Sequence, residues 1–122
     1  MGRAASAIRS QEEMLRRAIR FARKAAERLS VKAVYVVGSR ARGDYLDESD
    51  IDVVIVAHGV RKLNMKERLT LLADVAEPGV DYLVYDTEEW ETGTTVWIRQ
   101  LKKEAKRLSL NAMGEISGKD EE

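Results

Sequence analysis

The fold is decided by residues 33–57, AVYVVGSRARGDYLDESDIDVVIVA. The first five, Ala33–Val37, are apolar and rich in β-branched side chains, and they end abruptly at Gly38, which predicts a buried strand. The segment Ile51–Ala57 has the same character and predicts a second strand. Between them, Ser39–Ser49 is polar and contains glycine, as expected of a turn that leads from one strand to the next.

Helical and strand patterns alternate along the rest of the chain. A capping box formed by Ser10 and Glu13 predicts the start of a first helix, and Val80–Tyr85 predicts a third strand. Further helices are predicted after Asn64, from Thr87, and after Gly93 up to Leu108. This alternation predicts one α/β (α+β) domain over residues 10–110, with a flexible N-terminus (1–9) and a flexible C-terminal tail (111–122).

Composition excludes several classes of function. The 122 residues carry 21 Lys and Arg against 21 Asp and Glu, so bulk positive charge is absent and direct binding of nucleic acid is not expected. The chain has no cysteine and one histidine, His58, which excludes thiolate zinc sites, Cys nucleophiles and multi-histidine metal sites. We read His58 as a loop residue. No apolar run approaches the roughly 20 residues that span a bilayer, so the expected location is the cytoplasm.

The chemistry is concentrated around the turn between the first two strands. Gly38 has no Cβ and allows the backbone to approach a phosphate, while Ser39 adds a hydroxyl donor. Ten residues separate this pair from Asp50 and Asp52, whose spacing places both carboxylates on one face of a strand. Adjacent carboxylates without His or Cys nearby favour Mg²⁺ or Mn²⁺. A phosphate cradle beside such a cation site points to phosphoryl or nucleotidyl transfer.

The arginines and the serine of the turn have two interpretations each. Arg40 and Arg42 could bind phosphate oxygens bidentately, and Arg42 could equally pair with Asp44 or Asp47 and hold the loop. Ser49 precedes the aspartates and is either part of the nucleotide site or a turn residue.

These motifs resemble the signature of the minimal nucleotidyltransferase (MNT) family, within the DNA polymerase beta-like nucleotidyltransferase superfamily. The resemblance is specific over residues 34–56 and weaker, by the order of elements, from 10 to about 108. It implies a small mixed sheet flanked by helices, with ATP as donor substrate and two divalent ions held by three acids. Nucleotide binding would fall to Gly38, Ser39, Arg40, Arg42 and Ser49, and catalysis and metal binding to Asp50, Asp52 and Asp81.

The third acid is assigned by its place on a later strand. Asp81 lies at the start of the predicted strand 80–85, where the resemblance expects a metal ligand and general base. Asp86 is the competitor, but an offset of five residues places it on the opposite face of the strand.

The resemblance extends to a partner. The chain resembles the MNT half of paired MNT–HEPN systems, which implies an antitoxin that transfers AMP from ATP to a tyrosine of a HEPN-type ribonuclease toxin. Only about 35 residues follow Asp86, so we expect the acceptor side to come from a partner in a homo- or hetero-oligomer. Two alternatives remain: a non-catalytic binding module with a vestigial nucleotide site, and an aminoglycoside-type nucleotidyltransferase. Trp90 and Trp97 are read as core or interface anchors.

Overall fold

The structure, a computed structural model, describes residues 3–110 and 116–117. Its centre is a five-stranded mixed sheet with the order β3-β2-β1-β4-β5. The strands are β1 (Ser30–Val37), β2 (Ile51–His58), β3 (Val80–Asp86), β4 (Lys106–Leu108) and β5 (Ile116–Ser117). β2 pairs antiparallel with β1 and parallel with β3, while β4 is antiparallel to both β1 and β5. The predicted mixed sheet flanked by helices is confirmed.

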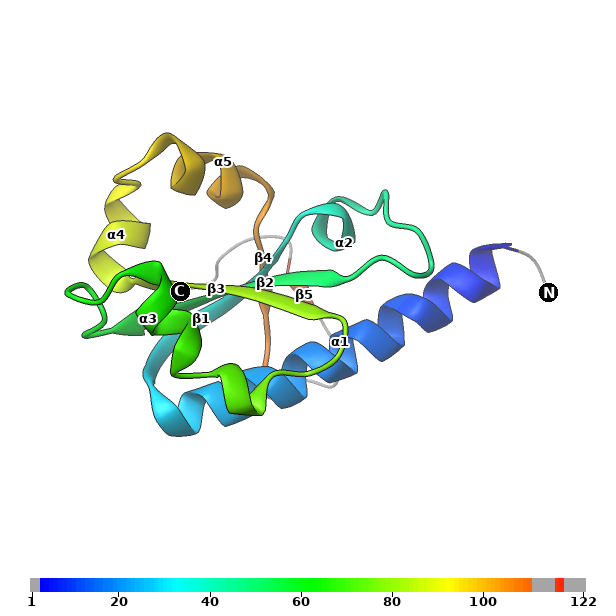
Figure 1. The fold of residues 1–122 in the computed structure, drawn as a ribbon. Coiled ribbons are helices and arrows are strands. Elements are labelled where there is room, and N and C mark those ends of the chain that lie inside the picture. Colours follow the sequence, from blue (N-terminus) through cyan, green and yellow to red (C-terminus); the bar gives the residue numbers. More distant parts are fainter. Residues whose placement is uncertain (1–2, 111–115, 118–122) are drawn as a thin grey trace.

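Helices cover both faces of the sheet. They are α1 (Arg3–Arg28), α2 (Ser39–Arg42), α3 (Met65–Thr70), the 3₁₀ turn η1 (Ala73–Val75), α4 (Thr87–Thr92) and α5 (Val96–Glu104). Figure 1 shows α1 running along one face, with α4 and α5 on the opposite side. Because neither face is open to water along most of its length, β1 and β2 are continuously apolar rather than alternating.

Alternation along each strand separates two hydrophobic clusters. On the α1 face, Val34 and Val36 pack with Ile51, Val53 and other residues of β2 against the helix. The opposite face contributes the following buried residues to a second cluster with α4 and α5: Ala33, Tyr35, Val37, Val54, Val56 and Tyr85. Asp52 and Asp81 have the same parity as this second set, which places them on the α4–α5 face.

The N-terminal helix is longer than the sequence indicates. α1 begins at Arg3, so the prediction that Ser10 caps it is wrong, and residues 3–9 are helical. This end of α1 contacts the loop that follows α2. The Ser10 hydroxyl donates to the Asp47 carbonyl at 2.5 Å, and the Tyr45 hydroxyl donates to the Ala7 carbonyl at 3.0 Å. Tertiary contact therefore extends the helix beyond the local capping signal.

The C-terminal helix is shorter than predicted. α5 ends at Glu104, Ala105 adopts an extended conformation, and Leu108 lies in β4 rather than on the helix. The pairing of Lys106 and Arg107 with β1 and the burial of Leu108 in the α1 cluster account for the change. The predicted tail, 111–122, lies outside the described residues except for 116 and 117. None of the helices in the described ranges is long and apolar enough to cross a membrane.

Two capping boxes fix the helices that follow β2 and β3. Asn64 and Glu67 exchange side-chain and backbone hydrogen bonds at the exposed start of α3, the helix predicted after Asn64. Asp86 and Glu89 do the same at α4, where the Asp86 carboxylate also accepts the amides of Gly59 and Val60, each at 3.1 Å. Burial alone would raise the pKa of Asp86, but these amide donors lower it.

We expect Asp86→Ala to destabilise the protein more than Asn64→Ala does. The first substitution leaves buried amides without an acceptor and should lower the free energy of unfolding by about 2–4 kcal/mol, against about 1 kcal/mol for the exposed cap. Urea denaturation followed by circular dichroism measures both. Because folding lowers the Asp86 pKa, the wild-type advantage is present above the ordinary carboxyl pKa and disappears as the pH falls through the folded value. Equal losses at neutral pH would contradict a buried role for Asp86.

Candidate active site

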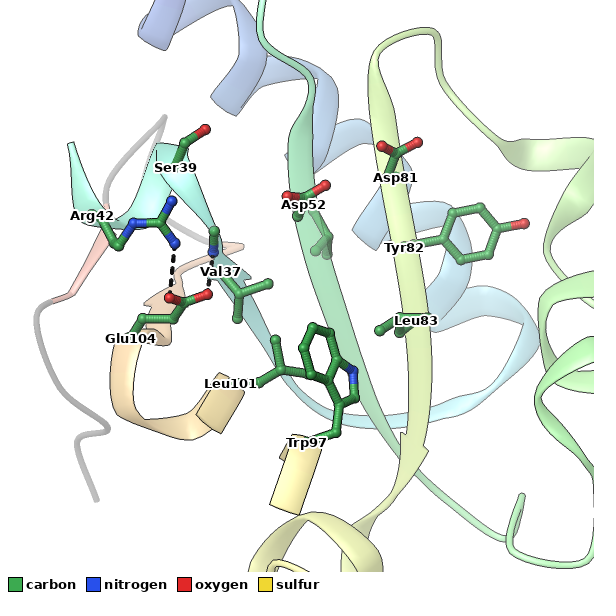
Figure 2. Close-up of a pocket in the computed structure, with 12 residues that line it drawn as sticks. Val37, Ser39, Arg42, Asp52, Asp81, Tyr82, Leu83, Trp97, Leu101 and Glu104 are labelled. Carbon is green, nitrogen blue, oxygen red and sulfur yellow. Dashed lines mark hydrogen bonds and ion pairs between the residues drawn. The ribbon is translucent and has the colours of Figure 1, made fainter. Parts of the chain in front are cut away.

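A pocket of about 560 Å³ opens on the α4–α5 face of the sheet, where β1 ends and β2 and β3 begin. It brings together five of the predicted site residues, namely Gly38, Ser39, Arg42, Asp52 and Asp81. Figure 2 shows the carboxylates of Asp52 and Asp81 at one end of this pocket and Trp97 and Leu101 at the other. The turn after β1 and the two aspartate-bearing strands therefore meet at one place, as the sequence predicts.

The strand register sets the spacing of the acids. In the parallel pair β2–β3, Asp52 lies directly opposite Asp81. Asp50, immediately before β2, reaches the same region, because its charge is close enough to raise the pKa of Asp81. Asp81 is exposed at the rim and Asp52 is half-buried, so the acids run from the interior of the pocket to its edge.

Burial and the charges of neighbouring acids disfavour ionisation of Asp52 and Asp81. Burial raises the pKa of Asp52, and the charges of Asp81, Asp50 and Glu104 raise it further, against a lowering by Arg42. Burial likewise raises the pKa of Asp81, followed by the charge of Asp50 and the hydrogen bond with it. Since folding raises both pKa values, the stability of the fold decreases as the pH rises through this range. The ionised cluster therefore lowers stability, and a bound cation would offset that loss.

The acids are close but do not form a finished metal centre. Among the residues that the structure describes, no three Asp, Glu, His or Cys side chains converge on a position that could hold a metal ion. The chemistry of the donor set still fits a hard divalent cation, because Asp50, Asp52 and Asp81 offer only carboxylate oxygens and repel one another.

Gly38 is required by the approach of Asp52. Its φ of 74° lies in the left-handed region, and a Cβ built there would stand 2.6 Å from the Asp52 Oδ2 atom. The Gly38 carbonyl accepts the amides of Ala41 and Arg42, each at 3.0 Å, which starts the short helix α2. The glycine thus turns the chain sharply while leaving room for a carboxylate beside the backbone.

A fourth acid, which the sequence does not single out, occupies the phosphate cradle. The Gly38 amide donates to Glu104 Oε2 at 2.7 Å, and Arg42 Nη1 donates to Glu104 Oε1 at 2.9 Å (Figure 2). Arg42 also donates to Asp44 at 3.2 Å, one of the two loop partners considered for it. Glu104 ends α5, 66 residues from Gly38, and no local pattern marks it. A carboxylate thus sits on the donors that we predicted for phosphate.

Arg40 has a different place from the one that we predicted. Its side chain is buried, and Nη2 donates to the carbonyl oxygens of Leu46, Asp47 and Ser49 at 3.3, 3.1 and 2.7 Å. The guanidinium also lies over the Tyr45 ring, 4.3 Å from its centre. Arg40 does not line the pocket; its buried guanidinium holds the loop between Gly43 and Asp50 through three of that loop's carbonyl oxygens.

Ser49 and Asp86 also lie outside the pocket lining. The Ser49 hydroxyl accepts the Leu46 amide at 3.0 Å, which makes it a turn residue, the second of its two interpretations. Asp86 caps α4, so Asp81 is the acid of β3 that reaches the site. Trp90 is buried in the core, as read from the sequence, but Trp97 is exposed and lines the pocket.

Replacing Gly38 by alanine should damage the fold more than the same change at Gly59. Both residues have a positive φ, 74° and 83°, but a Cβ at Gly59 would meet no atom within 4 Å. We expect Gly59→Ala to lower the free energy of unfolding by about 1 kcal/mol through backbone strain alone. Gly38→Ala should lower the free energy of unfolding by about 1 kcal/mol more than Gly59→Ala does, because the added Cβ clashes with Asp52. Urea denaturation measures both losses. The larger loss in Gly38→Ala should shrink to that of Gly59→Ala when Asp52 is also replaced by alanine. If the larger loss persists in the Asp52→Ala background, the clash is contradicted.

Comparisons with known proteins agree with this geometry. The profile of the nucleotidyltransferase domain family matches residues 18–109. The chain is also similar to a candidate nucleotidyltransferase from Sulfolobus solfataricus, known from a crystal structure at 1.40 Å resolution, with 40% sequence identity and a TM-score of 0.67. That similarity covers 71% of this chain and 79% of the other. No curated protein gives a significant match. The match spans both aspartate-bearing strands and the Gly38 turn, and the chain therefore belongs to the nucleotidyltransferase domain family.

Proposed function

We propose that this chain is a Mg²⁺-dependent adenylyltransferase that transfers AMP from ATP to a hydroxyl group of a protein, a tyrosine of a HEPN-type ribonuclease toxin. Membership of the nucleotidyltransferase family establishes the general reaction and a nucleotide substrate. The identities of the metal ion, of the nucleotide donor and of the acceptor are our proposal.

One observation carries the proposal: Asp52 and Asp81 lie opposite each other in a pocket that Gly38 and Ser39 also line. The acids repel one another and favour a cation, while the turn and Arg42 favour an anion. A nucleoside triphosphate bound with divalent metal supplies both charges in one ligand. Asp50, Asp52 and Asp81 would hold the metal, which neutralises charge that develops on the phosphates.

The residues then divide the reaction between them. Gly38, Ser39 and Arg42 bind the β- and γ-phosphates and so hold the α-phosphorus near the acids. The acceptor oxygen attacks that phosphorus, the bond to the bridging oxygen breaks, and pyrophosphate leaves with the electron pair. Asp81 accepts the hydroxyl proton, because it lies at the exposed rim of the pocket, where an acceptor can approach.

The assignment of the acceptor is supported by the motif between Gly38 and Asp52, which resembles that of minimal nucleotidyltransferases. An exposed Asp81 is compatible with a hydroxyl carried by a folded partner, because the base need not be reached through a narrow channel. Mn²⁺ would serve the same ligands as Mg²⁺.

A second candidate function is favoured by Glu104. Its carboxylate already pairs with Gly38 and Arg42, as expected if the site had lost its nucleotide and the protein only bound and masked a partner. The two functions differ in what they predict for ATP binding and transfer.

The deciding experiment measures transfer of label from α-³²P-ATP. The full chain is incubated with ATP, Mg²⁺ and the protein encoded by the adjacent gene. We expect label on a tyrosine of that protein, and Asp52→Asn should lower the rate at least about 10²-fold, as does the loss of other groups that stabilise transition-state charge. Glu48→Gln is the matched control, because Glu48 is an exposed acid of the loop just before β2 that does not line the pocket.

The outcomes separate the candidates. Partner binding without transfer and without affinity for ATP would leave the masking function. Transfer to an added aminoglycoside in place of the protein would overturn the assigned acceptor while keeping the reaction. A full rate in Asp52→Asn would contradict the assigned site.

Glu104→Gln should tighten binding of inorganic tripolyphosphate. The phosphate must displace the Glu104 side chain from Gly38 and Arg42, and removing its charge weakens the competition. For a partly exposed ion pair we expect a gain of about two- to five-fold by calorimetry in the presence of Mg²⁺. Asp44→Asn is the control, because it also removes a charge from Arg42 but leaves Gly38 paired with Glu104. A loss of affinity in Glu104→Gln would show that Glu104 assists the ligand rather than competes with it.

A further inference from the structure

The pocket has two chemically different ends. Gly38, Arg42 and the aspartates make one end polar and charged, whereas Leu83, Trp97 and Leu101 make the other end apolar (Figure 2). A volume of about 560 Å³ is typical of small-molecule sites. The cations and phosphates of the proposed reaction account for the polar end only.

Trp97 is the residue of this apolar end that folding does not explain. Its neighbour Ile98 and the later Leu101 are buried at 2% and 6% exposure and dock α5 on the sheet, but Trp97 is 58% exposed. Leaving so large an apolar surface in water gains nothing for the fold.

The indole nevertheless has a well-anchored neighbour in the core. Burial, followed by the charge of Glu89, raises the pKa of the Tyr85 hydroxyl, and the neighbouring Trp97 side chain lowers it in part, which places the indole beside Tyr85. Tyr85 is itself held in the core by stacking with Trp90 at a ring distance of 5.9 Å. Trp97 is thus an exposed aromatic surface at the edge of the pocket, beside a tyrosine that the core holds in place.

We propose that Trp97, backed by Leu83 and Leu101, forms the nucleobase subsite of this pocket and stacks on the base of the bound nucleotide. The inference rests on the proposed function, which places the polyphosphate of the same ligand at Gly38 and Arg42. A nucleotide has the same division as the pocket, a highly charged end and a flat apolar ring. Such stacking contributes about 5- to 150-fold to affinity for each base.

Stacking also predicts how selective the subsite is. Every base has a π-face, so Trp97 tolerates different bases and favours those with the larger ring area. ATP and GTP should therefore bind with similar affinity and more tightly than CTP and UTP.

The test compares ATP with inorganic tripolyphosphate, which lacks a base, on the full chain with Mg²⁺ by calorimetry. We expect Trp97→Ala to weaken ATP about 5- to 150-fold while leaving tripolyphosphate unchanged, and Trp97→Phe to retain most of the ATP affinity. Val96→Ala is the matched control, because Val96 is exposed on the same helix but does not line the pocket. Circular dichroism verifies that each variant is folded.

A second readout follows the indole directly. Quenching of tryptophan fluorescence by ATP, absent with tripolyphosphate and lost in Trp97→Phe, would support stacking. Equal effects of Trp97→Ala on both ligands, or no effect on either, would overturn the subsite. If neither ligand binds the wild-type protein, the proposed function fails first. Loss of binding to the toxin partner with unchanged ATP affinity would assign Trp97 to a protein contact and overturn the inference.

Discussion

The parallel register of β2 and β3 places Asp52 opposite Asp81, and much of the site follows from this pairing. Two carboxylates on neighbouring strands repel each other, and here burial adds to the unfavourable energy of ionisation. A fold gains no stability from such an arrangement, whereas a site that binds cations needs it. The surrounding apolar strands supply the stability that this cluster does not, since both faces of the sheet are covered.

The turn after β1 is shaped around the same cluster. Gly38 lets the backbone pass close to Asp52, and the buried guanidinium of Arg40 holds the carbonyls of the loop that leads back to Asp50. α1 adds a second restraint, because its N-terminal turns hydrogen-bond that loop through Ser10. The position of Asp50 beside Asp81 thus depends on contacts with a helix some forty residues earlier in the chain.

Local signals in the sequence were sufficient for the residues that depend on local geometry. The end of a strand at Gly38 and the two-residue spacing of Asp50 and Asp52 placed the turn and the acids, and alternation along β3 distinguished Asp81 from Asp86. The roles of residues with long-range partners could not be predicted. An arginine in a phosphate-binding pattern looks the same in the sequence whether it faces a ligand or, like Arg40, is buried against the carbonyl oxygens of a loop.

Helix α5 contributes what the sequence motif lacks. Trp97, Leu101 and Glu104 recur at intervals of four and three residues, so one face of this helix carries the exposed indole, a core anchor and the acid on the phosphate cradle. Leu101 is buried and fixes the helix between the other two. A ligand that displaces Glu104 at the end of α5 also meets Trp97 near its start, so the two events act on a single rigid element. Binding at the charged end of the pocket and binding at the apolar end would then be coupled through α5. A nucleotide carries phosphates and a base in one molecule, so it would contact both ends of the helix, which neither phosphate nor base alone can do.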